Sequence, residues 1–130
     1  MDRSTVLTVL VSLSLLIAPA GRAAEPSDAA MNRLASAKGC YLCHRADSEP
    51  PNARAMLPSA PSWKDIAVEY KGQKGAEERL TTIVLEGSGS DPEKQHWRGK
   101  VSQVGMLPNK SGIDKKQARQ LVRWILSSTP

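Results

Sequence analysis

Phenylalanine is absent from this 130-residue sequence, and aromatic residues make up only 4% of the chain. A core of the size that such a chain can build is short of bulky side chains, so a large apolar group would fill the remaining volume. The sequence also has no basic run interleaved with aromatic residues, although Lys and Arg outnumber Asp and Glu by 18 to 13. That absence argues against nucleic acid as a partner, whereas a mild positive charge is compatible with docking onto acidic protein surfaces.

Strand patterns and long apolar runs are missing too. No segment alternates convincingly between polar and apolar residues, and no internal repeat is present. The apolar run at residues 6–18 is too short for a comfortable membrane span, and small residues follow it at Ala20 and Ala23. This pattern predicts a cleaved secretory signal peptide, residues 1–23 or 1–20, which leaves residues 24–130 as one domain. We therefore expect export to the periplasm, with no stable membrane insertion after cleavage.

Cysteine and histidine occur only twice each, yet both cysteines and one histidine stand together in Cys40-Tyr41-Leu42-Cys43-His44. Cys-x-x-Cys-His is the attachment signature of c-type haem. Two thiols at this spacing reach the two vinyl groups on one edge of a porphyrin, and the histidine that follows lies close to the iron as its proximal ligand. The motif predicts one haem c (heme c), bonded covalently to Cys40 and Cys43 and ligated by His44.

Other uses of the two thiols stay open at this point. Cys40 and Cys43 are compatible with a short disulfide in an exported protein. A thioredoxin-like redox pair needs a βαβ context that the sequence does not show. A zinc site needs four nitrogen or sulfur ligands, and only His44 and the distant His96 are available to join the thiols.

The apolar spacing predicts an all-α domain with long loops. Four segments have the spacing of amphipathic helices: about 28–38, from 62 to the glycines at 72 and 75, 76–86, and from 114 onwards. Their caps are predicted at Ser27 or Asp28, at Ser62 with Asp65, at Gly87 and at Asp114. The inward residues are predicted to be Met31, Leu34, Ala35, Trp63, Ile66, Ala67, Tyr70, Leu80, Ile83, Val84, Ala118, Leu121, Val122, Ile125 and Leu126. The loops 45–61 and 87–112 are long for a compact domain unless they pack over a large apolar group such as a haem.

The second axial position of the iron decides the function. Met106 stands 62 residues after His44, far enough for the chain to reach the opposite face of the ring, with Gly105 allowing close approach. Met56, His96 or an open site are the alternatives; Met31 fits a core role better, and Met106 itself could be a loop methionine that fills a gap. A thioether ligand favours Fe(II) relative to imidazole, and a fully ligated iron is left with one-electron exchange.

The ordered combination of these residues resembles the small class I cytochromes c of bacterial periplasms, from about Met31 to Ser127. The resemblance rests on the segments Gly39-Cys40-Tyr41-Leu42-Cys43-His44, Ala60-Pro61-Ser62-Trp63-Lys64-Asp65-Ile66-Ala67, Gly75-Ala76-Glu77-Glu78-Arg79-Leu80, Trp97, Met106-Leu107-Pro108-Asn109 and Leu121-Val122-Arg123-Trp124-Ile125-Leu126. It implies the class I cytochrome c fold, in which four to five helices and long loops wrap around one covalent haem. The loops 45–61 and 98–105 are longer than usual, and Leu107 stands where a proline is common.

The resemblance also implies roles for single residues. Met106 would be the distal ligand, and Asn109 would form a hydrogen bond near it. The carbonyl of Pro61 would accept the Nδ1 proton of His44, so that Nε2 faces the iron. Trp97 would donate its indole N–H to a haem propionate. The first and last helices would cross, with Leu34 and Ala35 against Leu121 and Trp124.

These expectations favour a periplasmic monohaem carrier of single electrons, not an enzyme, with redox proteins of unknown identity as donor and acceptor. An alternative is an electron-transfer subunit of a periplasmic dehydrogenase complex, such as a sulfur-compound or molybdenum enzyme. A gas-binding or peroxidatic protein would need an open iron. Basic residues that could steer an acidic partner are Lys64, Lys71, Lys74, Lys100 and Lys110.

Overall fold

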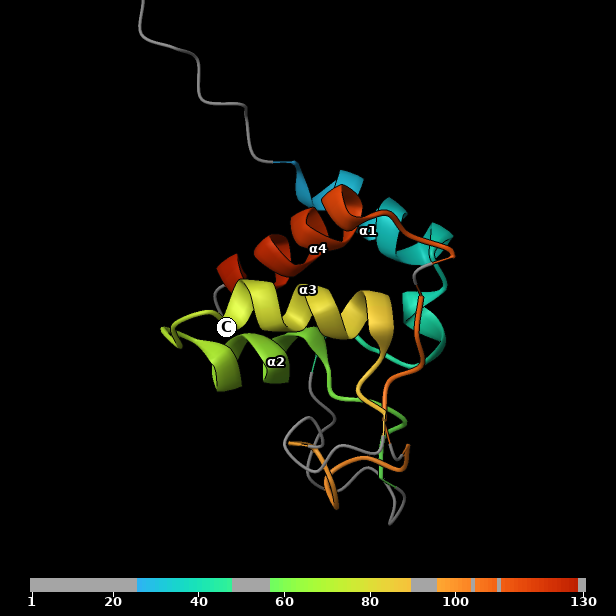
Figure 1. The fold of residues 1–130 in the computed structure, drawn as a ribbon, viewed down its shortest axis with the longest axis vertical. Helices are drawn as coiled ribbons and strands as arrows, with labels where there is room; N and C mark the ends of the chain where they lie inside the picture. Colours follow the sequence, from blue (N-terminus) through green and yellow to red (C-terminus); the bar gives the residue numbers. More distant parts are fainter. Residues whose placement is uncertain (1–25, 48–56, 90–95, 104, 110, 129–130) are drawn as a thin grey trace, which may run out of the picture.

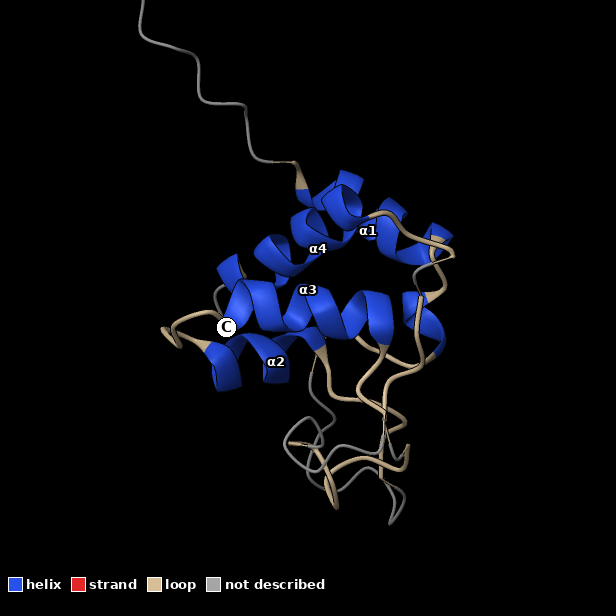
Figure 2. Ribbon diagram, in the orientation of Figure 1, coloured by secondary structure: helices blue, strands red, loops and turns tan. Residues whose placement is uncertain are grey.

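The computed structural model describes residues 26–47, 57–89, 96–103, 105–109 and 111–128. Its elements are α1 (Asp28–Ala37), the 3-10 turn η1 (Cys40–Leu42), α2 (Trp63–Tyr70), α3 (Ala76–Glu86) and α4 (Lys115–Ser127) (Figures 1 and 2). The predicted all-α class is confirmed, with four α-helices in the described residues. The predicted signal peptide, Met56 and Lys110 lie outside the described residues.

Three helices begin where their capping residues predict. The Ser27 hydroxyl accepts a hydrogen bond from Ala30 N at 3.3 Å. Ser62 accepts from Asp65 N at 3.0 Å, and the Asp65 carboxylate accepts from Ser62 N in return. The same reciprocal capping box joins Asp114 and Gln117 at the start of α4. Local hydrogen bonds of this kind satisfy amide groups that have no partner within the helix, so they set the helix starts independently of tertiary packing.

The C-terminal helix α4 is the centre of the core and packs against α1, α2 and α3. Among the described residues, Leu121 and Val122 of α4 are the largest side chains that are almost completely buried. The predicted crossing of the first and last helices is present in Figure 1, and Ala35 of α1 has no exposed surface. At the end of this crossing the indole Nε1 of Trp124 donates to Asp28 Oδ1 at 2.8 Å. The small residue at position 35 allows the two helices to approach closely.

The buried face of α3 agrees only in part with the prediction. Leu80 and Val84 pack against the core as predicted but are half-buried, as is Ile83, whereas Ala76 and Thr81 are buried. Thr81 escapes a period-based prediction because it is polar, yet its hydroxyl donates to the Glu77 carbonyl at 2.7 Å within the same helix. The apolar stripe of α3 is therefore incompletely covered by protein.

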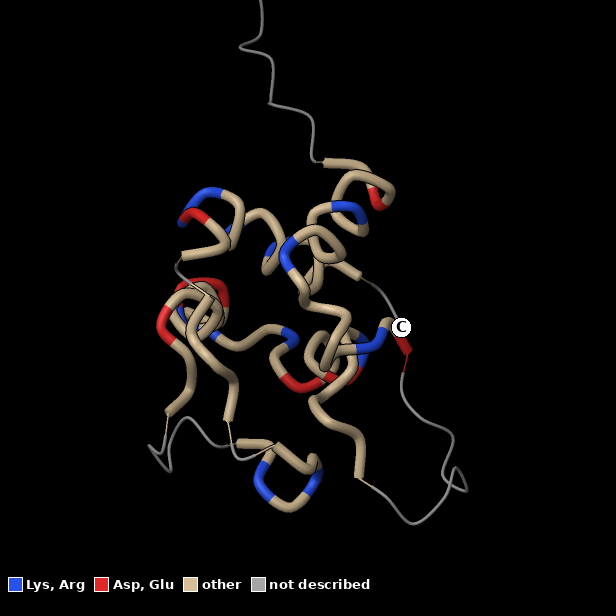
Figure 3. The backbone as a smooth tube through the Cα atoms, turned by 90° about the vertical axis from the view of Figure 1, so that its right-hand side faces the viewer, with Lys and Arg blue, Asp and Glu red and all other residues tan. Residues whose placement is uncertain are grey.

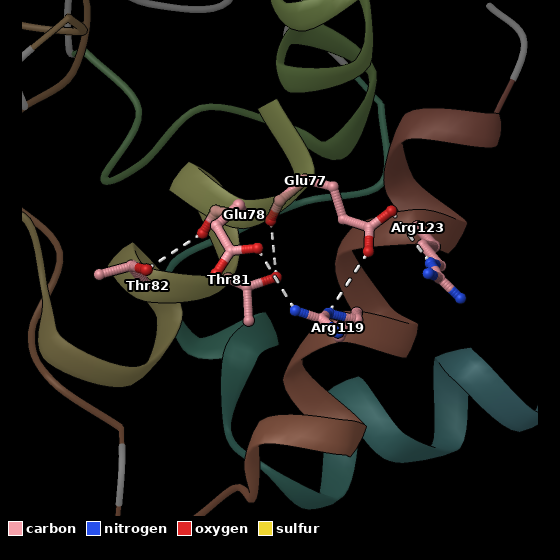
Figure 4. Close-up of polar contacts among 6 residues, drawn as sticks. All are labelled: Glu77, Glu78, Thr81, Thr82, Arg119 and Arg123. Atoms are coloured by element: carbon pink, nitrogen blue, oxygen red, sulfur yellow. Dashed lines mark hydrogen bonds and ion pairs between the residues drawn. The ribbon is translucent and has the colours of Figure 1, made fainter. Parts of the chain in front are cut away.

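Ion pairs join α3 to α4 at the surface. The Glu77 carboxylate lies between two arginines of α4, at 3.4 Å from Arg119 Nε and 3.0 Å from Arg123 Nε, and Glu78 also approaches Arg119 (Figure 4). These side chains are more than one-third exposed, so each pair contributes less than about 1 kcal/mol.

Two loop segments far apart in the sequence lie side by side beyond α2 and α3. Ser102 N donates to the Pro58 carbonyl at 2.8 Å, and Gln103 N donates to the Ser59 carbonyl at 3.3 Å. In Figure 1 these segments lie on the side of the molecule opposite to α1 and α4. In the described ranges, every helix is too short or too polar to cross a bilayer.

Candidate functional site

The two cysteines lie on a tight turn that follows α1 directly. Gly39 has a φ of 72°, a left-handed conformation that favours glycine, and it reverses the chain at the end of the helix. Cys43 N and His44 N both donate to the Cys40 carbonyl, at 3.2 and 3.0 Å. The 3-10 turn that results was not predicted from the sequence. Cys40 and Cys43 are free thiols, and burial raises the pKa of Cys40.

His44 is buried, with 8% of its surface exposed, and its orientation is set by one contact. Nδ1 lies 2.7 Å from the carbonyl oxygen of Pro61, which can only accept, so Nδ1 carries the proton. Nε2 is then the nitrogen with the available lone pair. Burial lowers the pKa of His44, while the hydrogen bond to Pro61 acts in the opposite direction. Burial, the larger effect, favours a neutral imidazole, which is the form that binds a metal.

An indole ring covers one face of this imidazole. The rings of Trp63 and His44 are stacked, with centroids 4.5 Å apart and 17° between their planes. Trp63 is only 6% exposed, yet its Nε1 has no hydrogen-bond partner among the described residues. A buried N–H without a partner costs free energy, and an acceptor on a bound group would satisfy it. The sequence pattern placed Trp63 on the core side of α2 but did not indicate the stacking.

Met106 is half-buried and is held through its backbone. Its N–H donates to the Ser88 hydroxyl at 2.7 Å, and its carbonyl accepts from Ser88 N at 3.0 Å. Ser88 is a buried residue that the sequence interpretation missed. Its position in Gly87-Ser88-Gly89, directly after a helix end, is the signal that could have indicated a close backbone approach.

Asn109 connects the Met106 segment to the cysteine turn. Its side-chain Nδ2 donates to the Lys38 carbonyl at 3.2 Å, and its backbone N donates to Val84 at 3.2 Å. The resemblance implies a hydrogen bond of Asn109 near Met106, and in the structure the Asn109 side chain binds the carbonyl of Lys38, two residues before Cys40. The contact nevertheless brings residues 105–109 to the end of α1 at which the motif begins.

The remaining candidates lie elsewhere. His96 is exposed, and its Nε2 is 2.9 Å from a carboxylate oxygen of Glu69. Met31 is buried in α1, as expected for a core residue. The half-buried Trp97 interacts with the side chain of Tyr70; burial raises the pKa of Tyr70, while Arg79 and this interaction with Trp97 act to lower it. Among the described residues, no three His, Cys, Asp or Glu side chains gather as a zinc or other metal site would require.

The site fits a covalently attached porphyrin. Two free thiols stand three residues apart, a buried neutral imidazole follows with its Nε2 available, and the Trp63 N–H lacks an acceptor. The half-buried apolar stripe of α3 adds surface suited to an apolar ring. Fold and site together define a helical protein of the c-type haem class.

Comparison with known proteins identifies the family. The chain is 34% identical to cytochrome c2 of Rhodocyclus tenuis over 94 residues, covering 72% of this chain and 87% of the relative. It is 32% identical to cytochrome c-551 of Allochromatium vinosum over 101 residues, covering 78% and 88%. The crystal structure of wild-type cytochrome c552 from Nitrosomonas europaea matches with a TM-score of 0.54 and 25% identity, covering 74% of this chain and 96% of that one. None of the protein-family models compared with the chain matches it.

The chain therefore belongs to the class I monohaem cytochromes c. It carries one haem c, attached through Cys40 and Cys43, and it is an electron carrier and not an enzyme. Its partners are redox proteins.

Proposed function

We propose that this protein is a periplasmic shuttle for single electrons, in which His44 and Met106 would be the two protein ligands that hold the haem iron. When bound, haem c supplies one-electron exchange between Fe(III) and Fe(II), and a sulfur ligand favours the reduced state relative to imidazole. Side chains at both axial positions leave no open site for oxygen or peroxide. This arrangement suits electron transfer and disfavours the gas-binding and peroxidatic alternatives.

The hydrogen bond from Asn109 to Lys38 carries the proposal. It joins positions 71 residues apart and brings the Met106 segment beside the residue that precedes Gly39 and Cys40. A second ligand to the haem iron would come from such a returning segment. The other described candidates lack this placement, because Met31 is buried in α1 and the imidazole of His96 contacts Glu69.

We assign Pro61 to orienting His44, because its carbonyl holds the Nδ1 proton and directs Nε2 away from the backbone. Asn109 positions the Met106 segment through Lys38. Trp97 stays the candidate donor to a haem propionate. In the described structure, its side chain interacts with Tyr70. Trp63 offers a second indole N–H near the proximal histidine.

Optical spectra of the exported protein test the ligation. We expect a pyridine haemochrome assay to give one haem per chain with two thioether bonds, because both thiols are free and follow the attachment spacing. The oxidised protein should show the weak far-red band of sulfur-to-iron ligation, and the reduced protein should bind carbon monoxide slowly. Absence of that band together with fast binding of carbon monoxide would contradict the proposed distal ligand.

Size-exclusion chromatography of a native periplasmic extract distinguishes a shuttle from a subunit. A free carrier elutes alone, whereas a subunit of a sulfur-compound or molybdenum dehydrogenase elutes with its enzyme. Two relatives support the shuttle. One is a cytochrome c2, of whose length the chain covers 87%, and the other is a cytochrome c-551, of whose length it covers 88%. Release into the periplasm rests on the predicted signal peptide at residues 1–23 or 1–20.

Ionic strength tests electrostatic steering of an acidic partner. Lys and Arg are interspersed with Asp and Glu over the elements in Figure 3, and the described lysines at positions 64, 71, 74 and 100 are exposed. We expect reduction by a redox protein of net negative charge to slow several-fold between about 0.01 M and about 0.15 M salt, since the Debye length falls from about 30 Å to about 8 Å. Stopped-flow kinetics measure this, with a neutral small-molecule reductant as the control. Equal salt dependence for both reductants would exclude steering.

A further inference from the structure

We propose that Ser88 is the positioning residue for Met106, holding its backbone so that the sulfur stays on the iron. The inference rests on the proposed ligation by Met106. It adds a second residue, in the loop after α3, and this residue controls how readily the Met106 sulfur dissociates from the iron. Ser88 is the second residue after the end of α3, 18 positions before Met106.

Ser88 binds Met106 from both sides of its Cα atom. The Met106 N–H donates to Ser88 Oγ at 2.7 Å, and the Met106 carbonyl accepts from Ser88 N at 3.0 Å. Binding both backbone groups of one residue restricts its φ and ψ angles together, and these angles decide where the side chain begins. The serine is only 6% exposed, so water cannot easily replace its hydroxyl.

The neighbouring glycines show that the two backbones are in close contact. A Cβ atom on Gly87 would lie 2.6 Å from the Met106 carbonyl oxygen, and one on Gly105 would lie 2.8 Å from both Ser88 Oγ and the Gly89 carbonyl oxygen. Any side chain at these two positions would push the segments apart. Glycine on both sides therefore allows the Ser88 hydroxyl to reach the Met106 amide.

The other hydrogen bonds of the segment 105–109 are made further along the chain, at Asn109. Asn109 binds Lys38 and Val84, which fixes the segment three residues beyond the sulfur. Those bonds hold the loop at the site, but neither is made by a backbone group of Met106. Within the described residues, the two bonds from Ser88 act on the backbone groups of Met106 itself.

The test compares Ser88→Ala with a matched loss of another buried hydroxyl. Thr81 of α3 is 2% exposed, and its hydroxyl also makes a 2.7 Å hydrogen bond, but this bond goes to Glu77 within the helix. We expect the oxidised Ser88→Ala holoprotein to bind exogenous imidazole about tenfold more tightly than wild type, because the unsatisfied Met106 amide weakens the ligand that imidazole displaces. On warming, the far-red band of Ser88→Ala should disappear at a lower temperature than the band of wild type. Thr81→Val should match wild type, and Ser88→Thr, which keeps the hydroxyl, should restore most of the loss.

The outcomes separate this inference from the proposed ligation. If Met106→Ala strengthens imidazole binding but Ser88→Ala does not, or if Thr81→Val has the same effect as Ser88→Ala, Ser88 has no positioning role. If Met106→Ala itself leaves imidazole binding and the far-red band unchanged, the proposed ligation fails and this inference fails with it. Amide hydrogen exchange of wild-type holoprotein gives a test that needs no variant. The Met106 amide should be strongly protected, and rapid exchange there would overturn the proposal.

Discussion

Replacing Met106 with alanine is expected to open the distal position of the iron. The oxidised variant should lose the far-red band, the reduced variant should bind carbon monoxide rapidly, and the reduction potential should fall by on the order of 0.1 V or more. The physical reason is that the thioether stabilises Fe(II), and water or hydroxide in its place does not. Absorption spectra, flash photolysis with carbon monoxide and a redox titration measure the three effects.

Met31→Leu is the matched control, because Met31 is the methionine that is buried in α1. It should keep the spectrum and the potential of wild type. His96→Gln should do the same, since the His96 imidazole lies at the surface beside Glu69. A Met106→Ala variant that keeps the far-red band would transfer the ligand role to another methionine, and Met56→Leu would then identify it.

Leu121→Ala should produce the largest loss of stability in the helical core. Leu121 is 1% exposed and belongs to the cluster in which α4 meets the other three helices. Removing its side chain leaves a cavity that the surrounding helices can fill only in part, so we expect a loss of about 3 kcal/mol in the free energy of unfolding. Guanidinium unfolding of the holoprotein, followed by circular dichroism, measures the change.

Val68→Ala provides the comparison for that experiment. Val68 lies on α2 and is 55% exposed, so its truncation should cost less than about 0.5 kcal/mol. A loss below about 1 kcal/mol for Leu121→Ala would mean that α4 is not the centre of the core. In that case the haem alone, and not the helix packing around it, would hold the fold together.

Local chemistry made much of this fold predictable. Ser27, Ser62 and Asp114 cap helices that begin at the next residue, because each capping bond spans only three positions. The stripe of α4 was predictable as well: Ala118, Leu121, Val122 and Ile125 are all buried, and only Leu126 is half-buried. The spacing of apolar residues in α4 and the helix caps depend on residues close together in the sequence, and both are found as predicted in the tertiary structure.

Which of the polar residues become buried was not predictable in the same way. Thr81 and Ser88 are buried and hydrogen-bonded, yet the sequence around Thr81 does not distinguish it from the exposed Thr82, and only the glycines on either side of Ser88 indicate its close backbone contact. The partner of Asn109 lies 71 positions away at Lys38. The stacking of Trp63 on His44 likewise depends on how the chain between them returns.

By itself the sequence determined the haem-attachment motif, the family resemblance, the helix starts and the choice of Met106 as the leading distal candidate. These follow from residue types at fixed short spacings, where covalent geometry and local hydrogen bonds leave few alternatives. Only the tertiary structure decided which groups hold Met106, which ring stacks on His44 and which face of α3 is covered. Those features depend on contacts between segments far apart in the chain, and packing selects such contacts only when the whole domain has formed.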